Sequence, residues 1–110
     1  MGTVTINVAI ELDGDQEDLD LAEAMVEGLP EIFQGIIAER HRQDQRWGGM
    51  DHDDSHSPYE WERMLGERIY HLTDCVGEAQ PRFRRALEEI ASLAVAAIQS
   101  FDRLNGNAGV

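Results

Sequence analysis

One stretch of this chain, residues 3–12, alternates apolar and polar side chains as a β-strand does, and no second stretch has that period. An isolated strand leaves its backbone N–H and C=O groups without partners, so it needs another strand beside it. The plainest source is the same strand of a second copy across a two-fold axis. Two alternatives are a short irregular strand near residues 48–54 and the sheet edge of another protein. We therefore expect a homodimer that pairs through Thr3 to Leu12.

All other apolar patterns in the chain have the spacing of helices. We expect four helices, over residues 17–29, 31–46, 58–76 and 81–104. Pro30 predicts a break or kink, and the composition of residues 50–56 predicts a polar loop. The predicted fold class is therefore mainly α: a helical bundle of about four helices with one N-terminal β-strand.

Two of these helices carry further signals. The sequence Ser57-Pro58-Tyr59-Glu60 has the form of a capping box with proline at the first helical position. The last helix repeats apolar residues at helical spacing: Phe83, Leu87, Ile90, Ala94, Ile98 and Phe101. A length of 110 residues fits a single domain. We divide it into an acidic strand-helix arm over 1–38, a helical part over 39–104 and a tail over 105–110.

The charges of the chain are unevenly distributed. Residues 1–39 contain ten carboxylates and neither lysine nor arginine, whereas residues 40–110 contain all nine arginines and twelve carboxylates. This pattern disfavours direct contact with nucleic acid or an anionic membrane and favours a basic partner. The bland alternative is a solvated acidic face that maintains solubility. The carboxylates that we expect to bind the partner are Asp13, Asp15, Glu17, Asp18, Asp20, Glu23, Glu27 and Glu31.

The cellular compartment is indicated by three features. No basic and apolar leader opens the chain, and its longest apolar run, from Leu93 to Ile98, is too short to cross a bilayer. The single Cys75 cannot form an internal disulfide and fits a reducing compartment. We expect a cytoplasmic protein.

The middle and end of the chain contain a further set of motifs: Glu39-Arg40-His41-Arg42-Gln43, Arg46-Trp47-Gly48-Gly49, His52-Asp53-Asp54 with His56, Trp61, and Ala94-Val95-Ala96-Ala97-Ile98. With these motifs, residues 39–104 resemble small phage and prophage proteins related to the MazG-like all-α nucleotide pyrophosphohydrolases. The resemblance implies a helical scaffold and the cytoplasm of a bacterial host. It also implies a role in host conflict, since small acidic phage proteins often block the DNA-binding surfaces of defence complexes.

The active enzymes of that superfamily hold magnesium with two motifs, Glu-x-x-Glu and Glu-x-x-Asp, because a hard cation needs several carboxylate oxygens. The resemblance places the first motif on Arg68 and His71, and the second on Glu89 and Ser92, so only Glu89 keeps its carboxylate. It therefore implies the scaffold more than the activity, with no catalytic residue and no cofactor. An alternative metal set, for Mg²⁺, Mn²⁺ or another ion, is Glu67, His71, Asp74 and Glu89. The competing interpretation is a solvated face paired with arginines of the last helix: Arg82, Arg84 and Arg85.

His52 and His56, with the aspartates around them, form a second cluster. Histidines at i and i+4 have metal-ligand spacing only in a helix, and the predicted loop argues against one. The alternatives are contact with a ligand, or a structural role in which the aspartates bond to their own backbone and Trp47 fixes the loop. The sequence leaves these roles open.

Two functional hypotheses follow. The first is a non-catalytic acidic interaction protein of phage type that binds a basic surface on a nucleic-acid-handling complex, as in anti-CRISPR or anti-restriction inhibition by DNA mimicry. The second is a metal-dependent MazG-like nucleotide pyrophosphohydrolase.

Overall fold

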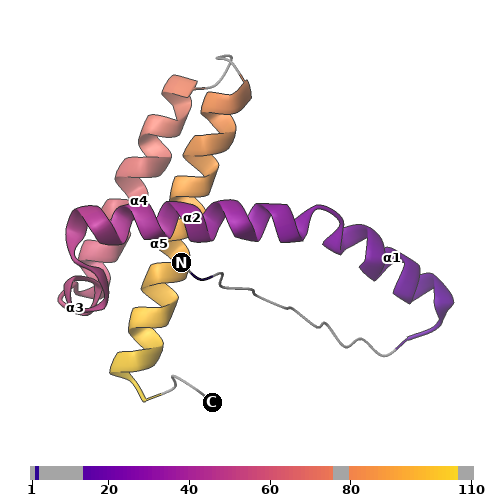
Figure 1. Ribbon diagram of the computed structural model, residues 1–110, viewed down its shortest axis with the longest axis horizontal. Helices are drawn as coiled ribbons and strands as arrows, with labels where there is room; N and C mark the ends of the chain where they lie inside the picture. Colours follow the sequence, from indigo (N-terminus) through magenta and orange to yellow (C-terminus); the bar gives the residue numbers. More distant parts are fainter. Residues whose placement is uncertain (1, 3–13, 76–79, 107–110) are drawn as a thin grey trace. The chain divides into compact units, whose positions relative to one another are not determined.

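The computed structural model of the chain (Figure 1) describes residues 2, 14–75 and 80–106. The expected mainly helical fold is confirmed in these residues, whose elements are α1 (Gln16–Val26), α2 (Leu29–Trp47), α3 (Gly49–Asp54), α4 (Pro58–Leu72), the 3-10 turn η1 (Thr73–Cys75) and α5 (Gln80–Leu104). The strand expected over residues 3–12, and the dimer pairing through it, lie outside them. None of the described helices combines the length and apolar character that a membrane span needs.

The chain divides into two compact units, Met1–Pro30 and Glu31–Val110. Residues 31–38, which the sequence assigned to the acidic arm, thus belong with the helical unit. In the first unit the expected helix over 17–29 is shorter, because α1 ends at Val26.

The break between α1 and α2 lies at Gly28 rather than at Pro30. Gly28 has φ +77°, a left-handed conformation that glycine adopts without steric cost. Pro30 lies in the first turn of α2. A proline is tolerated there, because the first N–H groups of a helix have no partner within it.

In the second unit α4 and α5 lie side by side (Figure 1), and α3 packs against the C-terminal half of α5. Helix α2 crosses α5 at a small residue, Ser92, whose side chain is fully buried. The Ser92 hydroxyl lies 2.7 Å from the Glu88 carbonyl oxygen, one turn back, and 3.2 Å from the Ile36 carbonyl oxygen of α2. A hydroxyl at the crossing lets the two backbones approach closely.

The structure corrects the prediction of a polar loop over residues 50–56, because Gly49–Asp54 form the short helix α3. Gly48 and Gly49 have φ +109° and +74°, so the chain turns sharply from α2 into α3. Asp51 lies in the first turn, where a carboxylate interacts favourably with the helix dipole.

The capping box at the start of α4 is confirmed. The Ser57 hydroxyl accepts a hydrogen bond from the Glu60 N–H, and the Glu60 carboxylate accepts one from the Ser57 N–H. These two bonds satisfy donors that the first turn leaves unpaired. They explain why α4 begins at Pro58, as expected.

Candidate functional site

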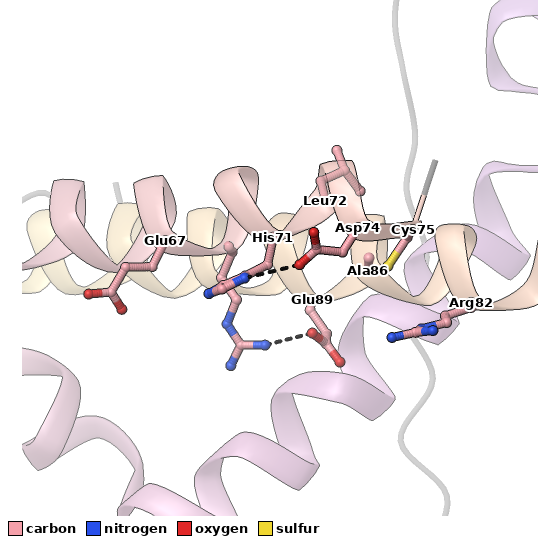
Figure 2. A pocket seen from close by; sticks show the side chains of 9 residues that line it. Glu67, His71, Leu72, Asp74, Cys75, Arg82, Ala86 and Glu89 are labelled. Carbon is pink, nitrogen blue, oxygen red and sulfur yellow. Dashed lines mark hydrogen bonds and ion pairs between the residues drawn. The ribbon is translucent and has the colours of Figure 1, made fainter. Parts of the chain in front are cut away.

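The four predicted metal-binding residues line one pocket of about 400 Å³ between α4, η1 and α5 (Figure 2). Helix α4 and turn η1 supply Glu67, His71 and Asp74, which recur along one side of the chain, and α5 supplies Glu89 across from them. The remaining lining residues are Arg68, Leu72, Cys75, Arg82 and Ala86. The sequence thus identified residues that share a site.

Arginines pair with the carboxylates of this pocket. Arg68 Nη1 lies 2.6 Å from Glu89 Oε2, and Arg85 Nε lies 3.7 Å from Glu89 Oε1. Glu67 is turned toward Arg63 of its own helix, with 3.3 Å between Nη1 and Oε1. The charge of each glutamate is therefore balanced by a guanidinium of the same unit.

The histidine and aspartate of the pocket face each other, with 3.4 Å between His71 Nδ1 and Asp74 Oδ2. Within the described residues, no three side chains of His, Cys, Asp or Glu come together as a metal site would require. Ser92, at the position where the resemblance expects an aspartate, is buried at the α2 crossing and does not line the pocket. The metal set therefore stays a prediction.

In the alternative interpretation, arginines of α5 pair with a solvated face of Glu67, His71 and Asp74. These three side chains are exposed, but Glu67 pairs with Arg63 and His71 contacts Asp74. Of the three arginines named for it, Arg85 pairs with Glu89, Arg84 pairs with Glu88 at 3.2 Å, and Arg82 lines the pocket. Glu39 of α2 is buried and accepts hydrogen bonds from Arg42 at 2.7 and 2.9 Å. This network of guanidinium and carboxylate groups ties α2, α4 and α5 together.

A row of four rings runs from the end of α2 to α4. The centroids of Trp47 and His52 are 6.4 Å apart with stacked planes, those of His52 and His56 are 4.7 Å apart, and those of His56 and Trp61 are 5.1 Å apart. Trp61 is buried and Trp47 is exposed. His56 also contacts Glu60 at 3.4 Å. The backbone N–H of Ser57, and after it His56, lower the pKa of the Glu60 carboxyl.

The two aspartates at the end of α3 have opposite environments. Asp54 accepts hydrogen bonds from Arg103 and Ser100, which lower its pKa below the ordinary 3.8. Burial raises the pKa of Asp53, and the nearby Asp44 raises it further. These contacts support the structural role for this cluster, but not through bonds to its own backbone: the Asp54 carboxylate binds α5, and the Asp53 carboxylate lies 4.0 Å from Arg40 of α2. The sequence missed Ser100 and Arg103 as partners because they lie 46 and 49 residues away.

The acidic segment differs from both clusters in its surroundings. The described carboxylate side chains of residues 14–31 are exposed: Asp15, Glu17, Asp20, Glu23, Glu27 and Glu31. Asp20 accepts a hydrogen bond from the neutral Gln16 amide at 2.8 Å. Asp13 and the side chain of Asp18 lie outside the described part of the chain.

Most arginines are engaged within the second unit. In the part of the chain that the structure describes, carboxylates of that unit pair with Arg40, Arg42, Arg63, Arg68, Arg84, Arg85 and Arg103. Arg46 lies over the Trp47 ring, 5.6 Å from its centroid. Glu17, Glu23 and Glu27, by contrast, have no cationic partner in the part of the chain that the structure describes.

The sequence matches no protein-family model, and comparisons with curated proteins and with solved structures give no match either. The resemblance to the MazG-like superfamily therefore rests on the motifs quoted above.

Proposed function

We propose that this protein is a non-catalytic interaction protein whose N-terminal carboxylates bind a basic surface on a nucleic-acid-handling complex. The resemblance to phage proteins extends the proposal to inhibition of host defence by DNA mimicry, of the anti-CRISPR or anti-restriction type. The observation that carries the proposal is the unequal pairing of charges in the two units.

In the described part of the second unit, arginines pair with six carboxylates: Glu39, Asp53, Asp54, Glu67, Glu88 and Glu89. These six therefore have little left to offer a cationic partner. Three exposed carboxylates of α1 and the following turn have no cationic partner in the described structure: Glu17, Glu23 and Glu27. They repel one another, and a basic surface would relieve that repulsion. Rigid helical presentation further reduces the entropy lost on binding.

The spacing of these charges is compatible with partial mimicry of DNA. In α1, residues 17–26 contain four carboxylates and extend over about 14 Å at about 1.5 Å per residue. Duplex DNA carries one phosphate per about 1.7 Å of axis, counting both strands. A single acidic helix is therefore sparser than DNA. Because its contacts with a basic surface would be between exposed charges, which salt screens, we expect its binding to weaken with salt.

The test is capture of a partner from lysate of a bacterial host on the immobilised full-length protein. We expect a nucleic-acid-binding protein to be retained at about 0.05 M NaCl and released at about 0.5 M, because screening shortens the range of surface charges. Duplex DNA should displace it in competition. A captured protein that resists both salt and DNA would contradict the proposal.

A pair of matched variants isolates the acidic segment. Glu17→Lys/Glu23→Lys reverses two exposed carboxylates of α1, and Asp51→Lys/Glu62→Lys makes the same charge change at two exposed carboxylates of the second unit. Only the first pair should abolish capture, while both should retain helical circular dichroism. Equal loss in both variants would point to net charge alone, and unchanged binding in both would remove the charge argument.

A second candidate function is metal-dependent nucleotide pyrophosphohydrolysis, favoured because Glu67, His71, Asp74 and Glu89 line one pocket. For a metal to bind there, the Arg68–Glu89 ion pair would have to open. The test is release of pyrophosphate from a panel of nucleoside triphosphates with Mg²⁺ or Mn²⁺. Turnover that disappears in Glu89→Gln would establish this function, and absence of turnover in the wild type would exclude it under those conditions.

A further inference from the structure

Helix α5 is the most amphipathic of the long helices that the structure describes, and its apolar side is left open. Leu87, Ala94, Ile98 and Phe101 recur at intervals of seven, four and three residues and therefore share one side of the helix. Of these, Leu87 is 42% exposed, Ile98 61% and Phe101 58%. Exposed apolar surface of this continuity is typical of an interaction site.

The opposite side of α5 is buried against the rest of the unit, and polar contacts hold it in that position. Ser92, Ala96 and Ser100 are buried against the rest of the unit, and Ser92 and Ser100 have no exposed surface. Ser100 and Arg103 both donate to the Asp54 carboxylate of α3, which fixes the rotation of the helix about its axis. Turning the apolar side inward would break these bonds, so α5 cannot cover this side by rotating.

We infer that the exposed side of α5 is a dimer interface, covered by α5 of a second copy in antiparallel orientation. The pattern is self-complementary about Ala94. When two such helices meet there, Leu87 of one copy lies opposite Phe101 of the other, and the small alanines at the centre allow close approach. No charged residue occupies the centre of this side, so the contact requires no burial of charge.

The charges that flank this side favour the antiparallel arrangement. Arg84, near the start of the helix, and Asp102, near its end, lie on the same edge of the apolar side. In antiparallel pairing, Arg84 of one copy comes beside Asp102 of the other, and this happens twice by symmetry. Parallel pairing would place like charges at the same level of the two helices, and would align the helix dipoles unfavourably.

The test is the mass of the full chain in solution by light scattering or sedimentation. We expect twice the chain mass of 12.4 kDa for the wild type and the single mass for Ile98→Asp. Tyr70→Asp provides the matched control, because Tyr70 is an exposed apolar residue of α4. That variant should remain dimeric. A monomeric wild type, or a dimer that persists in Ile98→Asp, would overturn the inference.

Two further measurements test the orientation. Under mild oxidation Ala94→Cys should form a disulfide-linked dimer, whereas the wild type, whose Cys75 is buried, and Gln99→Cys should not. Arg84→Asp should weaken the dimer by about two- to fivefold, as expected for a partly exposed ion pair, and Arg84→Asp/Asp102→Arg should restore it. A dimer that forms without crosslinking through position 94 would pair through another surface, such as the strand expected over residues 3–12, and would also overturn the inference.

Discussion

The Asp54 carboxylate and the Arg103 guanidinium form a two-point contact between α3 and the end of α5. Arg103 Nη2 lies 2.7 Å from Asp54 Oδ1, and Arg103 Nε lies 3.1 Å from Asp54 Oδ2. The Ser100 hydroxyl donates to the same carboxylate at 2.8 Å. A planar guanidinium that pairs in this way fixes orientation as well as distance. The short helix α3 is therefore anchored at its C-terminal end.

Removal of that contact should destabilise the protein. In Arg103→Ala the Asp54 carboxylate keeps only the Ser100 hydroxyl, so we expect a lower midpoint of thermal unfolding. Arg63→Ala is the control, because the Arg63–Glu67 pair lies on the exposed surface of α4 and contributes little. Arg103→Lys should recover only part of the loss, since an ammonium cannot reproduce the two-point contact. Equal midpoints for Arg103→Ala and Arg63→Ala would contradict this account.

The neighbouring aspartates should give opposite effects of pH on stability. The pKa of folded Asp54 lies below the ordinary 3.8, mainly because of the hydrogen bond from Arg103. The contribution of the Asp54 carboxylate to the free energy of unfolding is complete above about pH 3.8 and is lost as pH falls through the folded pKa. Asp54→Asn should therefore be less stable than the wild type at pH 7, by urea unfolding, and the difference should shrink under acid conditions.

Asp53 should behave in the opposite way. Burial and the nearby Asp44 raise its pKa in the folded state, although Arg40 opposes them. The folded protein thus favours protonated Asp53 more than the unfolded chain does. The resulting contribution to the free energy of unfolding is present below pH 3.8 and is lost as pH rises through the folded pKa. Asp53→Asn should be more stable than the wild type at pH 7, with the difference vanishing toward pH 3. A destabilised Asp53→Asn at pH 7 would mean that the contact with Arg40 outweighs burial.

Helix boundaries with local signals could be predicted from the sequence. Ser57 and Glu60 lie three residues apart, so the capping box is visible without knowledge of the fold. Helix α3 was missed because six residues are too few to display a helical period. Its polar composition resembles that of a loop, and its anchors on α5 are distant in the chain.

In the candidate site, too, relationships within one helix could be predicted and contacts between helices could not. Residues of one helix, such as Glu67 and His71, could be placed on one side by their spacing. The pairing of Arg68 with Glu89, 21 residues apart, depends on how α4 and α5 pack and could not be inferred. Periodicity likewise identified the apolar side of α5, but it could not show that this side is exposed. The contacts of Ser92, Ser100 and Arg103 decide which side of α5 faces the rest of the unit.

Two glycines inside helices should respond differently to alanine. Nothing lies within 4 Å of the position that a Cβ would take at Gly66, in the exposed part of α4. Gly66→Ala should therefore raise the free energy of unfolding by about 0.5–1 kcal/mol, because alanine loses less backbone entropy in a helix. At Gly35 the Glu88 carboxylate occupies the corresponding space, and it would have to move away. Gly35→Ala should therefore raise the free energy of unfolding less than Gly66→Ala does. An equal increase in the two variants would mean that the Glu88 side chain moves freely.

Substitutions of Ser92 test the local packing and the resemblance together. Ser92→Ala removes a hydroxyl that bonds mainly to the Glu88 carbonyl of its own helix, so we expect a loss of about 1 kcal/mol. Ser92→Asp would install the carboxylate that the MazG-like motif expects. In this fold, however, it would be fully buried and face the carbonyl oxygens of Glu88 and Ile36.

A carboxylate between two acceptors has no donor to stabilise it, so Ser92→Asp should cost about 3 kcal/mol or more in urea unfolding at pH 7. The loss should diminish under acid conditions, where the buried carboxyl takes up a proton. It should also leave Mn²⁺ binding, measured by calorimetry, no stronger than in the wild type, because position 92 does not line the pocket that contains Glu89. A stable Ser92→Asp variant with newly acquired Mn²⁺ binding would instead place residues 89 and 92 in one metal site, and would favour the hydrolase over the acidic interaction protein.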